Sequence, residues 1–252
     1  MSHLSPPFWL FLTFLPLLFL NRWISQHLQG AVLLLSHSEE VASLVYFVLL
    51  LPGVLLHEGS HWLMAKLLRV RTGKLTIGLN QKRGGVLEMG SVRVARADPV
   101  RDSLIGLAPL VGGSLTIFLI GRWVLSIEAL ARTLQSGDGA RIAAELWVVL
   151  HVPDFWLWLY LIFAISNAML PSASDRRPWP PVLIFLGGLV ALLYFTGWLL
   201  SLPPELAGLI ADGLSYLNLA FALTLAVDVA FALLILLLEL LLTRLTGWRV
   251  EY

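Results

Sequence analysis

Residues 50–66 read LLPGVLLHEGSHWLMAK, a nearly continuous apolar run that contains one His-Glu-x-x-His motif. Residues four positions apart lie on one face of an α-helix, so His57 and His61 can direct two imidazole nitrogens at one metal ion. Glu58 is adjacent to His57 and can exchange a proton with a water molecule held by that ion. The structural alternative is a pair of buried histidines and a buried glutamate hydrogen-bonded to neighbouring helices. Ionisable groups in hydrocarbon are costly and usually functional, which favours the metal site.

The composition is typical of a helical membrane protein. The 252 residues are 58% hydrophobic and 13% charged, with a mean hydropathy of +0.83. A water-soluble domain of this size does not need so much apolar surface, whereas a protein embedded in a lipid bilayer does. The net charge of +1, without a basic stripe, gives no indication of nucleic acid as a partner. Because the chain has no cysteine, any metal ion must be held by nitrogen and oxygen atoms.

The apolar runs predict an all-α polytopic membrane protein with about six transmembrane helices, forming a single membrane domain over residues 1–252. The first run lacks the basic start and the cleavage site of a signal peptide, so we interpret it as a retained helix. Polar residues at 26–40 predict an external connection, and the mixed composition of 128–153 predicts a segment lying along a membrane surface. The predicted membrane helices cover residues 8–25, 41–69, 102–127, 155–170, 182–201 and 217–244.

A short stretch after the motif changes its periodicity. Leu75, Ile77 and Leu79 alternate with polar or small residues, residues 80–85 are turn-like, and a second alternating run continues through Val92 and Val94. This pattern predicts a β-hairpin over residues 74–95, whose simplest interpretation is a surface hairpin without a role in function. In the helix that follows, Pro109, Gly112 and Gly113 are small enough to let its backbone pass close to a neighbouring helix.

Basic residues predict the orientation in the membrane. Nine of them lie between Lys66 and Arg101, and with six helices Arg176, Arg177, Arg244 and Arg249 fall on the same side. Because Lys and Arg are enriched in cytoplasmic loops, the hairpin, the metal-site end and both termini are predicted to be cytoplasmic. Four arginines lie opposite, at 22, 122, 132 and 141. Arginine-rich, lysine-poor usage favours a bacterial source, and hence a multi-pass protein of a bacterial cell membrane.

Two histidines leave a tetrahedral metal ion in need of a third protein ligand. The candidates near or within the membrane segments are Asp175, Asp228, Glu239 and His151. Asp175 is favoured because it follows a helix on the side where the His57 end lies, and Pro171 ends that helix so that the carboxylate can turn inward. Asp228 lies in the middle of the last predicted helix, where a structural hydrogen bond or ion pair is a better interpretation than catalysis.

At this point the chain resembles the site-2 protease family of intramembrane zinc metalloproteases. The resemblance rests on His57-Glu58-Gly59-Ser60-His61 in a membrane helix, on the hairpin after it, and on Asn167 to Asp175 at the end of a later helix. The second motif of the family is Asn-x-x-Pro followed by Leu-Asp-Gly. Here the spacing from Asn167 to Asp175 is kept, whereas Pro171 lies one position later and Ser174-Asp175-Arg176 replaces Leu-Asp-Gly. Ala108-Pro109-Leu110 also looks like the Gly-Pro segment of the family. The likeness covers residues 41 to about 181 and leaves the flanking helices 8–25, 182–201 and 217–244 outside it.

The resemblance implies a zinc-dependent endopeptidase that cleaves membrane-protein substrates within or beside the bilayer. It implies that His57, His61 and Asp175 hold Zn²⁺, and that Glu58 acts as general base and then general acid. Asn167 would bind the substrate backbone or help to hold the developing oxyanion, although a helix-end hydrogen bond explains it equally well. The hairpin would add an unwound substrate segment as an extra strand.

Two other classes of function are consistent with the residues. One is a catalytically silent relative that binds membrane helices as an adaptor, a role in which Glu58 would have no purpose. The other is a small transporter that uses His57, Glu58 and Asp228 as a proton or ion path and binds no zinc tightly. Metal content separates the transporter from the other two, and Glu58→Gln separates an enzyme from an adaptor. The pattern specifies neither a substrate sequence nor an oligomeric state.

Overall fold

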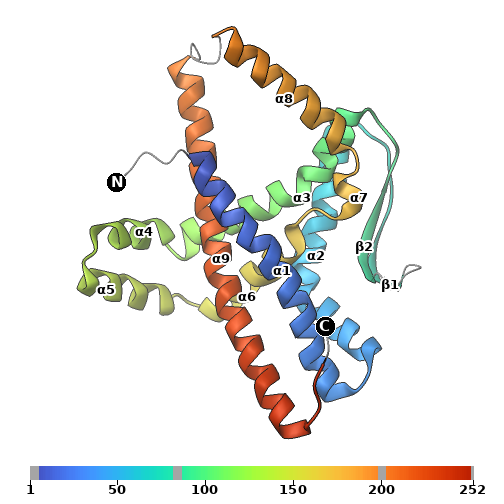
Figure 1. The fold of residues 1–252 in the computed structure, drawn as a ribbon, viewed down its shortest axis with the longest axis vertical. Helices are drawn as coiled ribbons and strands as arrows, with labels where there is room; N and C mark the ends of the chain where they lie inside the picture. Colours follow the sequence, from blue (N-terminus) through green and yellow to red (C-terminus); the bar gives the residue numbers. More distant parts are fainter. Residues whose placement is uncertain (1–5, 82–86, 198–202, 251–252) are drawn as a thin grey trace.

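The computed structural model describes residues 6–81, 87–197 and 203–250, and these are mostly helical (Figure 1). The chain forms nine α-helices within those residues, together with a two-stranded antiparallel sheet and a π-helical turn. In chain order the elements are α1 (Pro6–Ser36), α2 (Glu39–Leu67), β1 (Thr72–Gln81), β2 (Leu87–Val94), α3 (Pro99–Leu119), η1 (Ile120–Val124), α4 (Ile127–Ser136), α5 (Gly139–Leu150), α6 (Phe155–Met169), α7 (Ala173–Arg176), α8 (Trp179–Phe195) and α9 (Pro204–Thr246).

Four of the described helices are long and apolar enough to cross a membrane: α1, α2, α3 with its η1 extension, and α9. The predicted helical architecture is therefore confirmed, with four candidate membrane spans among the described residues, whereas the predicted count of about six spans is not. The apolar helix α8 has only 17 residues. The 15-residue helix α6 passes the test only when it is joined to α5, from which it is bent by 88°. Counting that bent pair as one span gives five.

The predicted external connection at 26–40 is wrong. Helix α1 continues through this segment as far as Ser36, and only residues 37 and 38 separate it from α2. The polar side chains that suggested a loop are satisfied inside the bundle: His27 Nδ1 lies 2.6 Å from Glu239 Oε2, and the Gln29 amide donates to the Ser25 carbonyl. Partners distant in the sequence, or one turn away, thus make polar positions compatible with an apolar helix.

Helices α1 and α9 run side by side in the same direction (Figure 1). Phe14 stacks on Phe221, His27 contacts Glu239, and the ring of His37 meets that of Trp248, so residue numbers increase together along both helices. Pro6 and Val250 therefore lie at opposite ends of this pair. The location of both termini on the side of the metal-site end stays a prediction, and the parallel course of α1 and α9 argues against it.

The core forms where α2 packs against α6 and α3, and small residues allow close approach. A Cβ atom added to Gly53 of α2 would lie 2.0 Å from the carbonyl oxygen of Ala164 in α6. On α3, the same addition would come within 2.5 Å of Ser60 Oγ at Gly112 and of Met169 Cβ at Gly113. The prediction that glycines bring this helix close to its neighbours is confirmed, and the three backbones are held around the motif of α2.

The predicted hairpin is confirmed. Strands β1 and β2 pair antiparallel with Leu75 opposite Val92 and Ile77 opposite Gly90, while turn residues 82–86 lie outside the described residues. Its strands pack along the C-terminal part of α2, the part that carries the motif. The hairpin is therefore placed to cover one side of the candidate site.

Residues 128–153, predicted to lie along a membrane surface, form most of α4 and all of α5. The two helices meet at Gly137, whose φ of 69° suits a residue without a side chain. Helix α5 exposes Leu146, Trp147 and Val148, an apolar surface that suits contact with lipid. Its placement along the membrane surface stays a prediction.

Candidate metal centre

Two backbone carbonyls fix the histidines of the motif. His57 Nδ1 lies 2.7 Å from the Ala168 carbonyl oxygen on α6, and His61 Nδ1 lies 2.8 Å from the Ile105 carbonyl oxygen on α3. A carbonyl oxygen only accepts hydrogen bonds, so each Nδ1 carries a hydrogen, and in the neutral form of each ring Nε2 keeps its lone pair. The two Nε2 atoms face each other at 3.1 Å. This is the arrangement in which an outer hydrogen bond orients a histidine ligand for a metal.

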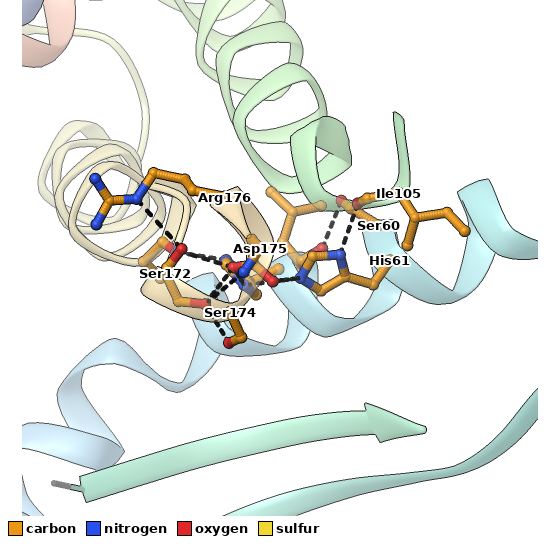
Figure 2. A network of polar contacts seen from close by, with 10 residues as sticks. Ser60, His61, Ile105, Ser172, Ser174, Asp175 and Arg176 are labelled. Carbon is orange, nitrogen blue, oxygen red and sulfur yellow. Dashed lines mark hydrogen bonds and ion pairs between the residues drawn. The ribbon is translucent and has the colours of Figure 1, made fainter. Parts of the chain in front are cut away.

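Asp175 approaches the same point from α7. Helix α6 ends at Met169, and the extended Leu170 and Pro171 redirect the chain into this short helix. Asp175 Oδ1 lies 3.3 Å from His61 Nε2, and Oδ2 lies 3.7 Å from His57 Nε2. Figure 2 shows His61 between Ile105 and Asp175. The structure thus brings together the three residues predicted as ligands, whose donor atoms all lie within 4.8 Å of one another.

The turn that carries Asp175 is held in two ways. Ser172 and Asp175 form a capping box: the Asp175 Oδ2 atom accepts from the Ser172 backbone and hydroxyl, and the Ser172 hydroxyl accepts from the Asp175 backbone. On the other side, a Cβ atom added to Gly106 of α3 would lie 2.2 Å from the Asp175 carbonyl oxygen. The carboxylate therefore reaches the histidines because Ser172 orients it and Gly106 leaves room for its backbone.

The donor set fits a tetrahedral zinc ion. Ligand bonds of about 2.0–2.1 Å place neighbouring donor atoms about 3.3 Å apart. The two Nε2 atoms lie 3.1 Å apart, Asp175 Oδ1 lies 3.3 Å from His61 Nε2, and the other carboxylate oxygen, Oδ2, lies 3.7 Å from His57 Nε2. Two imidazole lone pairs and a carboxylate facing one another would repel without a proton or a metal ion between them, and two nitrogens with one oxygen are a common set for catalytic zinc. With three protein ligands, one tetrahedral position is left for water or substrate.

The charge state of Asp175 suits a ligand. Burial by itself raises the pKa of this carboxyl group, but hydrogen bonds from the protonated ring of His61 and from Ser172 outweigh it, so the pKa lies below its ordinary value. Asp175 is consequently a carboxylate at neutral pH, the form that binds a metal cation.

Glu58 lies beside the histidines in a cavity of about 710 Å³ between α2, β2 and the ends of α6 and α7. Its side chain is buried, at 7% exposure, beneath the second strand of the hairpin. A Cβ atom on Gly90 would come within 2.8 Å of Glu58 Cγ, so only glycine allows β2 to pack this closely. The cavity is lined by Asn21, Tyr46, Val54, His57, Glu58, His61, Met89, Gly90, Ser91, Val92, Asn167, Ala168, Leu170, Ser172, Ala173, Ser174 and Asp175.

Asn167 also lines this cavity, and its side chain is held by protein groups. Its amide nitrogen donates to the Phe163 carbonyl and to Asp228 Oδ1, at 2.9 and 3.2 Å. Its Oδ1 accepts from the side chain of Asn21 at 3.3 Å. The helix-end hydrogen bond is therefore present, while a contact between Asn167 and a substrate stays a prediction.

The other candidates for the third ligand lie elsewhere. Asp228 accepts from the hydroxyl of Ser166, which confirms the structural hydrogen bond predicted for it. Glu239 contacts His27, and His151 Nδ1 donates to the carbonyl of Trp147. None of the three belongs to the group of potential ligands found among the described residues.

Several supporting residues were not anticipated from the sequence. Ser172 had a readable signal, since Ser-x-x-Asp is the pattern of a capping box. Gly90 and Asn21 had none, because they reach the cavity through packing between segments distant in the sequence. The same holds for the carbonyls of Ile105 and Ala168, whose role does not depend on their side chains.

No protein-family model, no curated protein and no solved structure matches this chain.

Proposed function

We propose that the protein is a zinc-dependent endopeptidase that cleaves membrane proteins within or beside the bilayer. One observation carries the proposal: His57, His61 and Asp175 converge on one point of a cavity that also contains a buried glutamate. A structural histidine pair would not need both Nδ1 atoms tied to carbonyls and both Nε2 atoms turned toward a carboxylate. An acidic group adjacent to such a set is the usual partner for hydrolysis.

In this proposal His57, His61 and Asp175 hold the ion. When bound there, zinc would polarise a substrate carbonyl and lower the pKa of water at the site. Glu58 takes a proton from the attacking water as a new C–O bond forms. It then returns that proton to the amide nitrogen as the C–N bond breaks, so a carboxyl group and an amine are released. Burial of Glu58 beneath β2 limits access of bulk water and strengthens its interaction with the reacting groups.

The substrate must present an extended segment. A transmembrane helix hides its peptide bonds in its own hydrogen bonds, so a local stretch has to unwind before attack. Strand β2 lines the cavity from Met89 to Val92, and one of its edges pairs with β1. In the described two-stranded sheet no strand pairs with its other edge, where an unwound segment can add through backbone hydrogen bonds.

We place the metal-site end of the bundle on the cytoplasmic side. Seven of the nine basic residues from Lys66 to Arg101 belong to the part of the chain that the structure describes, and they lie at this end together with Arg176 and Arg177, around the hairpin and α7. Pro6 lies at the same end, whereas Arg244 and Arg249 lie at the other because α9 runs parallel to α1. The excess of basic residues therefore still favours a cytoplasmic metal site after the number of spans is corrected. Fusion of a reporter to each terminus should give opposite locations.

The decisive experiment compares the wild type with Glu58→Gln, purified in detergent and also expressed in cells. We expect both proteins to contain one zinc per chain and only the wild type to accumulate cleaved fragments of membrane proteins. Gly59→Ala is the matched control, because a Cβ atom there meets nothing within 4 Å, and it should cleave like the wild type. Zinc in both proteins with equal fragment patterns would instead identify an adaptor. Absence of tight zinc in the wild type would identify the transporter alternative.

A further inference from the structure

Asp228 is a buried acidic residue that the proposed chemistry does not use. It lies in α9, outside the stretch that carries the metal site, and only 2% of its surface is exposed. Its Oδ1 atom lies 2.7 Å from the Ser166 hydroxyl and 3.2 Å from the Asn167 amide nitrogen, both on α6. An acidic side chain at such depth is costly, so these two contacts call for an explanation.

The contacts determine which way the amide of Asn167 faces. A side-chain amide has a donating nitrogen on one side and an accepting oxygen on the other. The Phe163 carbonyl and Asp228 Oδ1 both accept, so the nitrogen must face them. The oxygen then faces Asn21 on α1, which also lines the cavity. Without the acceptor on Asp228, only the Phe163 carbonyl and the Ser166 hydroxyl hold the nitrogen in place.

We propose that Asp228 is a positioning residue that presents Asn167 Oδ1, an acceptor, on the wall of the cavity. The inference rests on the proposed function, and it specifies what Asn167 recognises. The amide hydrogens of Asn167 are engaged by α6 and α9, so Asn167 does not hold an oxyanion. Its oxygen receives one hydrogen bond from Asn21 and has a second lone pair for a backbone N–H of an extended substrate.

The same network reaches the metal centre from a second direction. The Asn21 amide donates to the backbone carbonyl of Asn167 at 2.9 Å. The next carbonyl along the chain, that of Ala168, holds His57. Helices α1 and α9 thus both hold the end of α6, through Asn21 and Asp228, close to the point where α6 supports both the cavity wall and a metal ligand.

The test measures substrate binding separately from cleavage. In the Glu58→Gln background, loaded with zinc, the probe is a fluorescent single-span peptide with a central proline that unwinds its helix. We expect Asp228→Ala to weaken binding of this peptide by about tenfold, within the usual range of coupling between contacting residues. Asp228→Asn, which keeps a carbonyl oxygen as acceptor, should restore most of that loss. Zinc stoichiometry should stay unchanged in every variant.

Two further variants separate positioning from packing. In a double-mutant cycle, adding Asp228→Ala to Asn167→Ala should cause no further loss, because Asp228 acts through Asn167. Thr224→Val is the matched control: Thr224 is similarly buried, lies one turn away on α9, and within the described residues its hydroxyl donates to the Ala220 carbonyl of its own helix. Its variant should bind the peptide like the parent.

Three outcomes would overturn the inference: additive losses in the cycle, an Asp228→Asn variant as weak as Asp228→Ala, or a loss from Thr224→Val equal to that from Asp228→Ala. Each can be observed whether or not the wild type cleaves. Intact peptide binding in a wild type that loads zinc but never cleaves would instead reject the proposed function.

Discussion

Among the described residues, histidine meets a carboxylate at two places within or beside the apolar helices, and the two places differ in how the histidine nitrogens are used. At the metal centre, His57 and His61 use their Nδ1 atoms to bond backbone carbonyls, which leaves both Nε2 atoms facing Asp175. In the pair between α1 and α9, His27 Nδ1 contacts Glu239 itself, at 2.6 Å. The ring of Trp23 stacks on His27 with the centroids 4.0 Å apart.

The difference shows that residue type does not by itself identify a metal site. At His27 a ring nitrogen is used directly by the carboxylate, and no group of three potential ligands forms there among the described residues. At His57 and His61 the carbonyls hold the rings, so two lone pairs and one carboxylate converge beside a cavity. The first arrangement fastens two helices together, and the second leaves room for an ion.

The largest difference between the two places should be the loss of zinc when a histidine is replaced. His61→Ala removes a ligand, so we expect affinity for zinc to fall on the order of a thousandfold, since each ligand carries a substantial part of the binding energy. His27→Ala is the matched change in the other pair and should keep the zinc of the wild type. Zinc content of the purified proteins, measured by mass spectrometry with increasing chelator, provides the test. Equal loss in both variants would break the comparison.

Substitutions of the two acidic residues, Asp175 and Glu239, should also differ in their effect on the affinity for zinc, by a smaller factor than the histidine substitutions. Asp175→Ala should weaken zinc binding about a hundredfold, and Ser172→Ala, which only releases the orientation of Asp175, about tenfold. Glu239→Ala should have no effect on zinc. Titration with a competing chelator measures all three, and an affinity in Asp175→Ala equal to that of the wild type would remove Asp175 from the ligand set.

A change next to the centre should affect cleavage alone. In Gly90→Ala the new methyl group meets Glu58 Cγ at 2.8 Å, so β2 or the Glu58 side chain must shift. We expect cleavage to fall about tenfold with zinc content unchanged, as for other small displacements of a catalytic group. Gly59→Ala, which meets nothing within 4 Å, is the control. Full activity of Gly90→Ala would argue against a role for Glu58 in its present position.

The smallest effect is expected from the contact between His27 on α1 and Glu239 on α9. Glu239→Gln should lower the free energy of unfolding by about 1–2 kcal/mol, the size of interhelical polar contacts in membranes, and should not affect cleavage at permissive temperature. Thermal unfolding in detergent measures the change. A double variant with His27→Ala should be no less stable than the sum of the two single variants predicts. Loss of cleavage in Glu239→Gln without loss of stability would show that the pair does more than join α1 to α9.

Local patterns predicted much of the fold and the centre. The period of the motif in α2, the alternation that marks β1 and β2, and the small residues of α3 each depend on neighbours within a few positions. Asp175 was also predicted, because Pro171 ends α6 and turns the chain. Failures occurred where a polar residue has a distant partner, as for His27 in the segment taken for a loop.

The sequence by itself determined that this chain is mostly helical, with helices long and apolar enough to cross a membrane, a histidine motif, a hairpin and an acidic residue suited to complete a metal site, since periodicity and local sterics fix these features. Only the tertiary structure decided that α9 runs parallel to α1, that Pro6 and Val250 lie at opposite ends of this pair, and that Asp228 holds Asn167. It also decided which carbonyls orient the histidines. The physical reason is that every residue carries a backbone carbonyl, so no local pattern marks the carbonyls that will hold a histidine. Their positions, and the partners of buried polar side chains, are fixed only when helices distant in the chain come into contact.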